Sequence, residues 1–265
     1  MLPCNALCHR LARLSLITLA MLALPVHAAS SVHVYAAASL TDALDAAAAR
    51  YEQSHDVDIV PVYASSSTAA RQVANGAPAD LYVSANERWM DWLAEQGIPL
   101  QARTDLLLNR LVLIASPQTD IEPFSPGEGA SLAERLEDGQ RLSVGDPAHV
   151  PAGIYARQAL KSLGEWNTLE PRLARADNVR AALALVERGE TPLGIVYRTD
   201  AMASDKVRQL GQFPSDSHAP ITYPAALIGK APDEAAQAFL NWLKGDEAMA
   251  VFNSFGFLPA DASAH

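Results

Sequence analysis

Cysteine is nearly missing from this sequence, which has only Cys4 and Cys8 in 265 residues. Both precede a short apolar stretch at residues 14–24, which follows two arginines and ends in small residues. A basic start, a short apolar core and a small-residue end are typical of a cleaved secretory signal peptide. We therefore expect residues 1–28 to be removed. The mature chain then has no disulfide, no thiolate metal ligand and no cysteine nucleophile.

Positive charge is also scarce. The chain has 20 basic and 30 acidic residues, a formal charge of -10, which becomes -12 when a leader with two arginines and no acids is removed. Such an acidic chain does not suit nucleic acid or an anionic membrane surface. Taken alone, the charge also disfavours an anionic ligand. No apolar run after the leader is long enough to span a membrane, so we expect a soluble exported protein.

What remains is a regular alternation of strand and helix patterns. Short β-prone runs are followed by helical spacing of apolar residues, as at 32–35 and 40–51, and the pattern repeats through the chain. We expect further strands at 57–63, 80–84, 111–115, 142–144, 194–197 and 221–228, and helices at 68–74, 87–96, 131–137, 154–163, 180–188 and near the C-terminus. This alternation predicts an α/β fold with mainly parallel sheets.

Four turns that lead from a strand into a helix carry polar or small residues. In the first, Ser39 stands at the expected helix N-cap, with Asp42 three residues later. The second has four successive hydroxyls at residues 65–68. The third is Asp146-Pro147-Ala148-His149-Val150-Pro151-Ala152-Gly153, where Pro151 suits a first helical turn. The fourth is Asp177-Asn178-Val179-Arg180.

These turns point to an anion or a small polar ligand. Helix starts expose unpaired backbone N–H groups and the positive end of the helix dipole, so several that converge form an anion site without charged side chains. Ligands of open α/β sheets sit beyond the carboxyl ends of the strands, where such turns lie. Each turn taken singly is explained by helix capping alone, and the residues by themselves leave both interpretations open.

At these turns the chain resembles the molybdate-binding proteins of bacterial ABC importers. The matching runs extend from about Val32 to Phe257. They are Tyr35-Ala36-Ala37-Ala38-Ser39-Leu40, Ala64 to Gln72, Gly76-Ala77-Pro78-Ala79-Asp80-Leu81, Gly145 to Tyr155 and Gly194-Ile195-Val196-Tyr197. Members of that family hold a tetrahedral oxyanion with serine hydroxyls, backbone N–H groups and a tyrosine hydroxyl. The resemblance implies that the oxyanion, and with it the molybdenum, is bound here by Ser39, Ser66, Ala152, Val179 and Tyr197. Asn178 stands where many relatives are expected to have an acid.

The same resemblance implies a two-lobed periplasmic binding protein of type II, with two chain crossovers and the ligand in the cleft between the lobes. Residues 29–109 and 222–265 are then one lobe, and residues 110–221 are the other. The expected function is high-affinity periplasmic binding of molybdate or tungstate and delivery to the membrane permease of an ABC importer. We expect a monomer with no cofactor and no nucleic-acid partner.

A pocket made only of donors suits this ligand. Molybdate near neutral pH is a fully deprotonated dianion whose oxygens only accept hydrogen bonds, whereas phosphate retains a proton that needs an acceptor. Sulfate has the same charge and shape in a smaller size, so only the size of the cavity can exclude it. Tungstate is nearly the same size as molybdate and is expected to bind comparably.

Two other functions are weighed against this one. A serine hydrolase using Ser39 or Ser66 lacks a Gly-x-Ser-x-Gly elbow and an obvious histidine partner. A receptor for amino acids or polyamines needs an arginine or a carboxylate in the cleft, and the four turns offer no convincing one. The histidines are scattered without zinc spacing, and His149 is expected in an exposed loop. Trp89 and Trp92 are expected to pack rather than bind.

Overall fold

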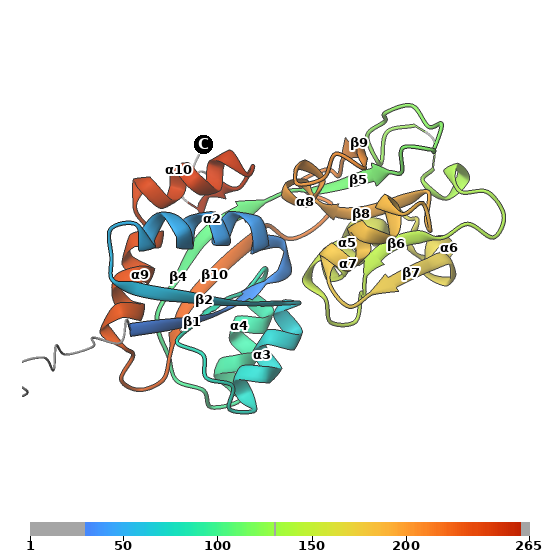
Figure 1. The fold of residues 1–265 in the computed structure, drawn as a ribbon. Helices are drawn as coiled ribbons and strands as arrows, with labels where there is room; N and C mark the ends of the chain where they lie inside the picture. The colour runs from blue at the N-terminus through green and yellow to red at the C-terminus, as the bar shows by residue number, and fades with distance from the viewer. Residues whose placement is uncertain (1–29, 130, 261–265) are drawn as a thin grey trace, which may run out of the picture. The chain divides into compact units, whose positions relative to one another are not determined.

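The computed structural model of the chain describes residues 30–129 and 131–260 and contains two β-sheets, each covered by helices (Figure 1). The expected signal peptide, residues 1–28, lies outside the described residues. Within the described ranges, no helix combines the length and the apolar character needed to cross a bilayer. The described residues from Ser31 onward belong to one compact unit.

The first sheet has six strands in the order β11-β4-β10-β3-β1-β2. These strands are β1 (Ser30–Ala37), β2 (Val57–Ala64), β3 (Leu81–Val83), β4 (Leu100–Asn109), β10 (Ile221–Ile228) and β11 (Leu258–Pro259). Its helices are α2 (Thr41–Glu52), α3 (Ser66–Ala74), α4 (Glu87–Glu95), α9 (Glu234–Leu243) and α10 (Asp246–Ser254). Figure 1 shows α2 and α9 on one side of this sheet and α3 and α4 on the other.

The alternation of side chains along the central strands explains why helices cover both faces. Val34 and Ala36 of β1 belong to the main apolar cluster, whereas Tyr35 between them belongs to a second cluster with Trp89 and Met90 of α4. The same period of two recurs in β3 and β10. Successive residues of a strand point to opposite faces, so strands that are apolar throughout need a cover on each side.

The second sheet has five strands in the order β7-β6-β8-β5-β9. They are β5 (Leu111–Ala115), β6 (Leu142–Gly145), β7 (Leu173–Ala176), β8 (Leu193–Tyr197) and β9 (Arg208–Gln212). Its helices are α5 (Pro151–Ser162), α6 (Trp166–Leu169), α7 (Val179–Glu187) and α8 (Arg198–Met202). The 3₁₀ turns among the described residues are η1 (Ala38–Leu40), which follows β1, and η2 (Ala133–Arg135) and η3 (Glu170–Arg172). The α/β class predicted from the sequence is confirmed.

The expectation of mainly parallel sheets was wrong, because both sheets are mixed. β1 pairs in parallel with β3, and β6 with β7 and β8. However, β10 is antiparallel to β3 and β4, and β5 is antiparallel to β8 and β9. The chain passes from the first sheet to the second between β4 and β5 and returns between β9 and β10. β5 and β10 each follow a strand of the other sheet rather than a local helical crossover, and local sequence patterns do not reveal the direction in which such a strand enters its sheet.

The helix expected at residues 131–137 is also absent, and only η2 forms there. The guanidinium of Arg172 donates to the backbone carbonyls of Ala133, Leu136 and Glu137 at 3.3, 3.0 and 2.5 Å. The Glu137 N–H donates to the side chain of Gln140 at 2.9 Å. The groups that a helix would pair with one another therefore have other partners, and the segment continues as a loop.

Candidate functional site

A small cavity lies where the first turns of α3, α5 and α7 meet the ends of β1 and β8. Its volume is about 10 Å³, close to the space that one water molecule needs, and no charged residue is part of its lining. Pockets for drug-sized ligands have roughly 300–1,000 Å³, so this cavity is far smaller than such a pocket. The lining consists of Ala37, Ala38, Ser39, Ser65, Ser66, Ala85, Val150, Pro151, Ala152, Asn178, Val179 and Tyr197.

All five residues predicted to bind the oxyanion lie in this lining, although they are far apart in the sequence. Ser39 is in η1, Ser66 is the first residue of α3, and Tyr197 ends β8. Ala152 and Val179 lie in the first turns of α5 and α7, where no preceding helical carbonyl is available for their N–H groups. Two helix starts thus offer backbone donors and the positive ends of their dipoles to the same cavity.

Ser39 does not cap a helix, which corrects the prediction from sequence. The residue before α2 is Leu40, and no side chain caps that helix. The Ser39 hydroxyl instead lies 2.8 Å from the Tyr223 hydroxyl on β10, and both side chains are buried. A strand pairing that is distant in the sequence therefore decides the environment of Ser39.

The serines at the start of α3 have different hydrogen-bonding roles. Ser65 is the N-cap, and its Oγ accepts the Thr68 N–H at 3.3 Å. Ser66 is 1% exposed, and its Oγ accepts the Ala85 N–H at 2.9 Å. One lone pair of Ser66 is thereby occupied, and its hydroxyl hydrogen is left to donate. Capping thus explains Ser65 and leaves Ser66 available for a ligand.

The Tyr197 hydroxyl is buried and, among the described residues, has no hydrogen-bond partner. A buried polar group without a partner costs about 1–3 kcal/mol, so it is uncommon in native proteins. Burial, followed by the neighbouring Tyr223, raises the pKa of Tyr197 well above its ordinary value. The phenol therefore keeps its proton at physiological pH and can donate a hydrogen bond into the cavity.

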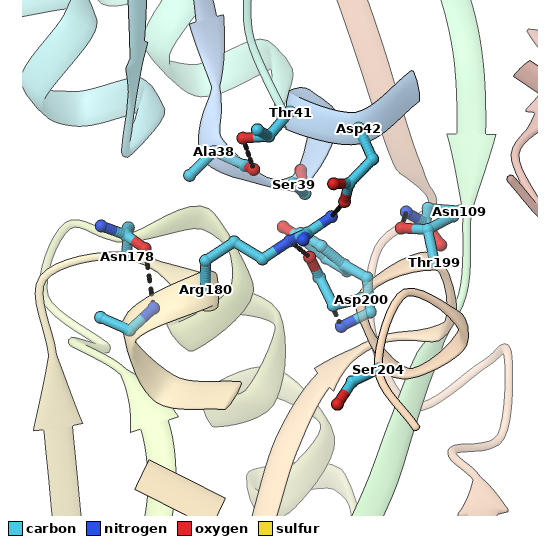
Figure 2. A network of polar contacts seen from close by, with 12 residues as sticks. Ala38, Ser39, Thr41, Asp42, Asn109, Asn178, Arg180, Thr199, Asp200 and Ser204 are labelled. Carbon is cyan, nitrogen blue, oxygen red and sulfur yellow. Dashed lines mark hydrogen bonds and ion pairs between the residues drawn. The ribbon is translucent and has the colours of Figure 1, made fainter. Parts of the chain in front are cut away.

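Figure 2 shows an ion-pair network around Arg180, the residue after Asn178 and Val179 of the cavity lining. Asn178 caps α7 by accepting the Ala181 N–H at 2.9 Å, and two residues later Arg180 pairs with two carboxylates. Its Nη2 lies 2.6 Å from Asp42 on α2, and its Nε lies 2.6 Å from the fully buried Asp200 on α8. From the sequence, Asp200 was not identified as a residue of interest. The only hint in the sequence is that an acidic residue stands three positions after the end of β8. The network joins helices that pack on different sheets.

Asp200 makes stability depend on pH. Burial raises the pKa of Asp200 from 3.8 to about 6, although Arg180 opposes the shift. The native carboxyl then holds its proton more tightly than the unfolded one, so stability falls as the pH rises from about 4 to about 6. We expect a loss of roughly 3 kcal/mol over this range. Urea unfolding at several pH values should show this loss in the wild type and not in Asp200→Asn, and equal profiles would contradict it.

His149 was predicted to lie in an exposed loop, and this prediction was wrong. It is partly buried, and its Nδ1 lies 3.1 Å from the Ser67 hydroxyl of α3. Its backbone carbonyl accepts the indole N–H of Trp89 at 2.8 Å. Trp89 therefore packs, as expected, and also ties the loop before α5 to α4. In residues 30–129 and 131–260, no three His, Cys, Asp or Glu side chains are grouped so that they could hold a metal ion.

The chain matches the family described as bacterial extracellular solute-binding protein over residues 32–258. This match covers most of the chain, which therefore belongs to that family of solute-binding proteins. Within it, the chain is similar to the molybdate-binding protein ModA of Escherichia coli (strain K12), with 46% identity over 227 residues that cover 85% of this chain and 88% of that protein. The ModA of Haemophilus influenzae (strain ATCC 51907 / DSM 11121 / KW20 / Rd) is 44% identical over 232 residues, which cover 87% of this chain and 91% of that protein. The resemblance inferred from the sequence is confirmed.

Solved structures agree on the fold. The periplasmic molybdate-binding protein of Azotobacter vinelandii superposes with a TM-score of 0.74 at 24% identity, covering 86% of this chain and 98% of that one. The sulfate-binding protein SubI of Mycobacterium tuberculosis H37Rv has a TM-score of 0.70 at 19% identity and covers 88% of each chain. At these identities the likeness concerns the fold alone, and it confirms the predicted periplasmic binding protein architecture.

Proposed function

We propose that this protein binds molybdate and tungstate in the periplasm and delivers them, as a monomer, to the membrane permease of an ABC importer. The observation that carries the proposal is the buried Tyr197 hydroxyl, which has no partner among the described residues and lies beside an uncharged cavity. The ModA relatives are named for molybdate binding. Membership in a solute-binding family supports a binding protein rather than a serine hydrolase.

The donors around the cavity suit a fully deprotonated dianion. Ser66 has one lone pair occupied by a backbone N–H, and Ala152 and Val179 offer backbone donors at helix starts. Hydrogen bonds to a charged group are worth roughly 1.5–3 kcal/mol each, so several together offset the desolvation of the ion. The absence of any charged residue from the lining also disfavours amino acids and polyamines, because those ligands need an arginine or a carboxylate.

We infer that residues 29–109 with 222–265 form one lobe and residues 110–221 the other. The division is supported by the strands, because β1 to β4, β10 and β11 share one sheet and β5 to β9 share the other. Ser39 and Ser66 then belong to one lobe, and Ala152, Val179 and Tyr197 to the other. A ligand that contacts both lobes favours the closed state by its additional contacts there.

Calorimetric titration of the mature protein with molybdate, tungstate, sulfate and phosphate tests the function. We expect micromolar or tighter binding of the first two and far weaker binding of the others. Ser39→Ala and Ser66→Ala each remove one donor to a charged ligand, so each is expected to weaken molybdate binding by about tenfold to a hundredfold. Equal binding of sulfate, no heat with molybdate, or unchanged affinity in both variants would contradict the proposal.

A further inference from the structure

The hydroxyl of Ser39 is the last member of a chain of buried hydrogen bonds that starts at the junction between the two sheets. Asn109, the last residue of β4, donates through Nδ2 to the Tyr223 hydroxyl at 3.2 Å and to the Thr199 hydroxyl at 2.9 Å. The Tyr223 hydroxyl lies 2.8 Å from Ser39 Oγ. Each of these four side chains is at most 8% exposed. Figure 2 shows Asn109 and Thr199 close together near Ser39.

The directions of these hydrogen bonds follow from one backbone group. The Arg110 N–H donates to Asn109 Oδ1 at 2.8 Å, which orients the amide with its two N–H donors toward Thr199 and Tyr223. Tyr223 has a single hydrogen, and it cannot point at an N–H donor. Its hydrogen must therefore point at Ser39 Oγ. The Ser39 hydrogen in turn cannot point back at Tyr223, and no other protein acceptor is recorded for it among the described residues.

We propose that Asn109 is a positioning residue that acts through Tyr223. Because Asn109 makes Tyr223 a donor to Ser39, Tyr223 cannot accept the Ser39 hydrogen, so Ser39 donates toward the cavity and selects against oxyanions that carry a proton. The inference rests on the proposed function and adds the groups that set the polarity of its site. A ligand O–H group that lies where the Ser39 hydrogen points can be accepted only if Ser39 turns that hydrogen away, and no other protein acceptor for it is found among the described residues. Molybdate needs only the donor, whereas hydrogen phosphate needs an acceptor for its own O–H group.

The decisive variant reverses the direction of the hydrogen bonds that link residue 109, Tyr223 and Ser39, and it keeps the shape of the side chain at position 109. In Asn109→Asp, the side chain still accepts the Arg110 N–H, but it now presents an acceptor to Tyr223. Tyr223 then donates to Asp at position 109, Ser39 donates to Tyr223, and Ser39 presents a lone pair to the cavity. At mildly alkaline pH, molybdate and hydrogen phosphate are both dianions, so the added charge affects the two alike. We expect the ratio of molybdate to phosphate affinity to fall at least about tenfold.

A second substitution separates this reversal from a charge effect. Tyr223→Phe in the Asn109→Asp background keeps the added charge but removes the link to Ser39, so the affinity ratio is expected to return to near the wild-type value. Tyr223→Phe alone should leave the ratio within about threefold of wild type, because Ser39 can still donate. Asn86→Asp is a matched control, since Asn86 is another buried asparagine with no recorded hydrogen bond to Ser39.

Competition titrations with molybdate and inorganic phosphate on these variants test the inference. An unchanged ratio in Asn109→Asp, or a reduced ratio that persists in the double variant, would overturn it. If Asn109→Asp does not fold, neutron diffraction of the wild type with molybdate decides, because the hydrogen between Tyr223 and Ser39 must belong to Tyr223. Failure of wild-type protein to bind molybdate contradicts the proposed function itself, which separates that outcome from failure of the inference alone.

Discussion

Replacing Gly153 with alanine is expected to lower molybdate affinity by about a hundredfold or more, because it displaces the start of α5. A Cβ at this position would lie 1.9 Å from the carbonyl oxygen of Gly145, where β6 ends, and 2.8 Å from the carbonyl carbon of Asp146. Both neighbours are backbone atoms, which cannot rotate away. The helix start must therefore shift by about 1 Å, and with it the N–H of Ala152, which donates to the charged ligand in the proposed site.

Gly211→Ala is the matched control for this effect. Its Cβ would lie 2.0 Å from the Phe124 carbonyl oxygen, an equally severe backbone contact, but neither Gly211 nor Phe124 lines the cavity. Overpacking of this kind costs about 1–3 kcal/mol or more of stability in either variant. We expect both variants to unfold at lower temperature and only Gly153→Ala to bind molybdate weakly. Equal affinities in the two folded variants, measured by calorimetry, would show that α5 does not contact the ligand.

Arg180→Ala is expected to destabilise the ligand-free protein by about 3–5 kcal/mol, because it leaves a buried carboxylate without its partner. Asp200 is fully buried, and Arg180 is its cationic neighbour, at 2.6 Å. The loss should shrink at low pH, where Asp200 is protonated in the folded and unfolded states alike. It should also shrink when Asp200→Asn is added, so that a double-mutant cycle shows strong coupling between the two residues.

The second ion pair of Arg180, with Asp42, provides a control for the cost of a buried carboxylate. Asp42 also lies 2.6 Å from Arg180, but its side chain is 45% exposed. Water already solvates that carboxylate, so Asp42→Ala is expected to cost at most about 1 kcal/mol. Urea unfolding of both single variants and of Arg180→Ala/Asp200→Asn measures these differences. An Asp42→Ala loss as large as that of Arg180→Ala, or no recovery in the double variant, would contradict the assignment of the cost to the buried carboxylate.

The strand and helix patterns of the sequence predicted most elements because their apolar residues recur with the period of the element. The strand at 100–109 was missed because its first half is polar and half exposed. The helix predicted at 131–137 failed for a different reason, since Arg172, far along the chain, donates to the Ala133 carbonyl, which such a helix would pair with the Glu137 N–H. Local periodicity indicates which side of a segment is buried. It contains no information about a side chain far along the sequence that forms hydrogen bonds with the backbone of that segment.

For the site, the sequence by itself determined which turns can offer donors and, through the resemblance, which five residues to expect around the ligand. Small residues, hydroxyls and helix starts are local features that a single chain displays directly. Only the tertiary structure decided that these residues line one cavity, that Ser39 pairs with Tyr223 rather than capping a helix, and that Arg180 joins Asp42 to the buried Asp200. The direction of a hydrogen bond and the burial of a charge depend on partners that are brought together only when β10, α2, α7 and α8 have packed.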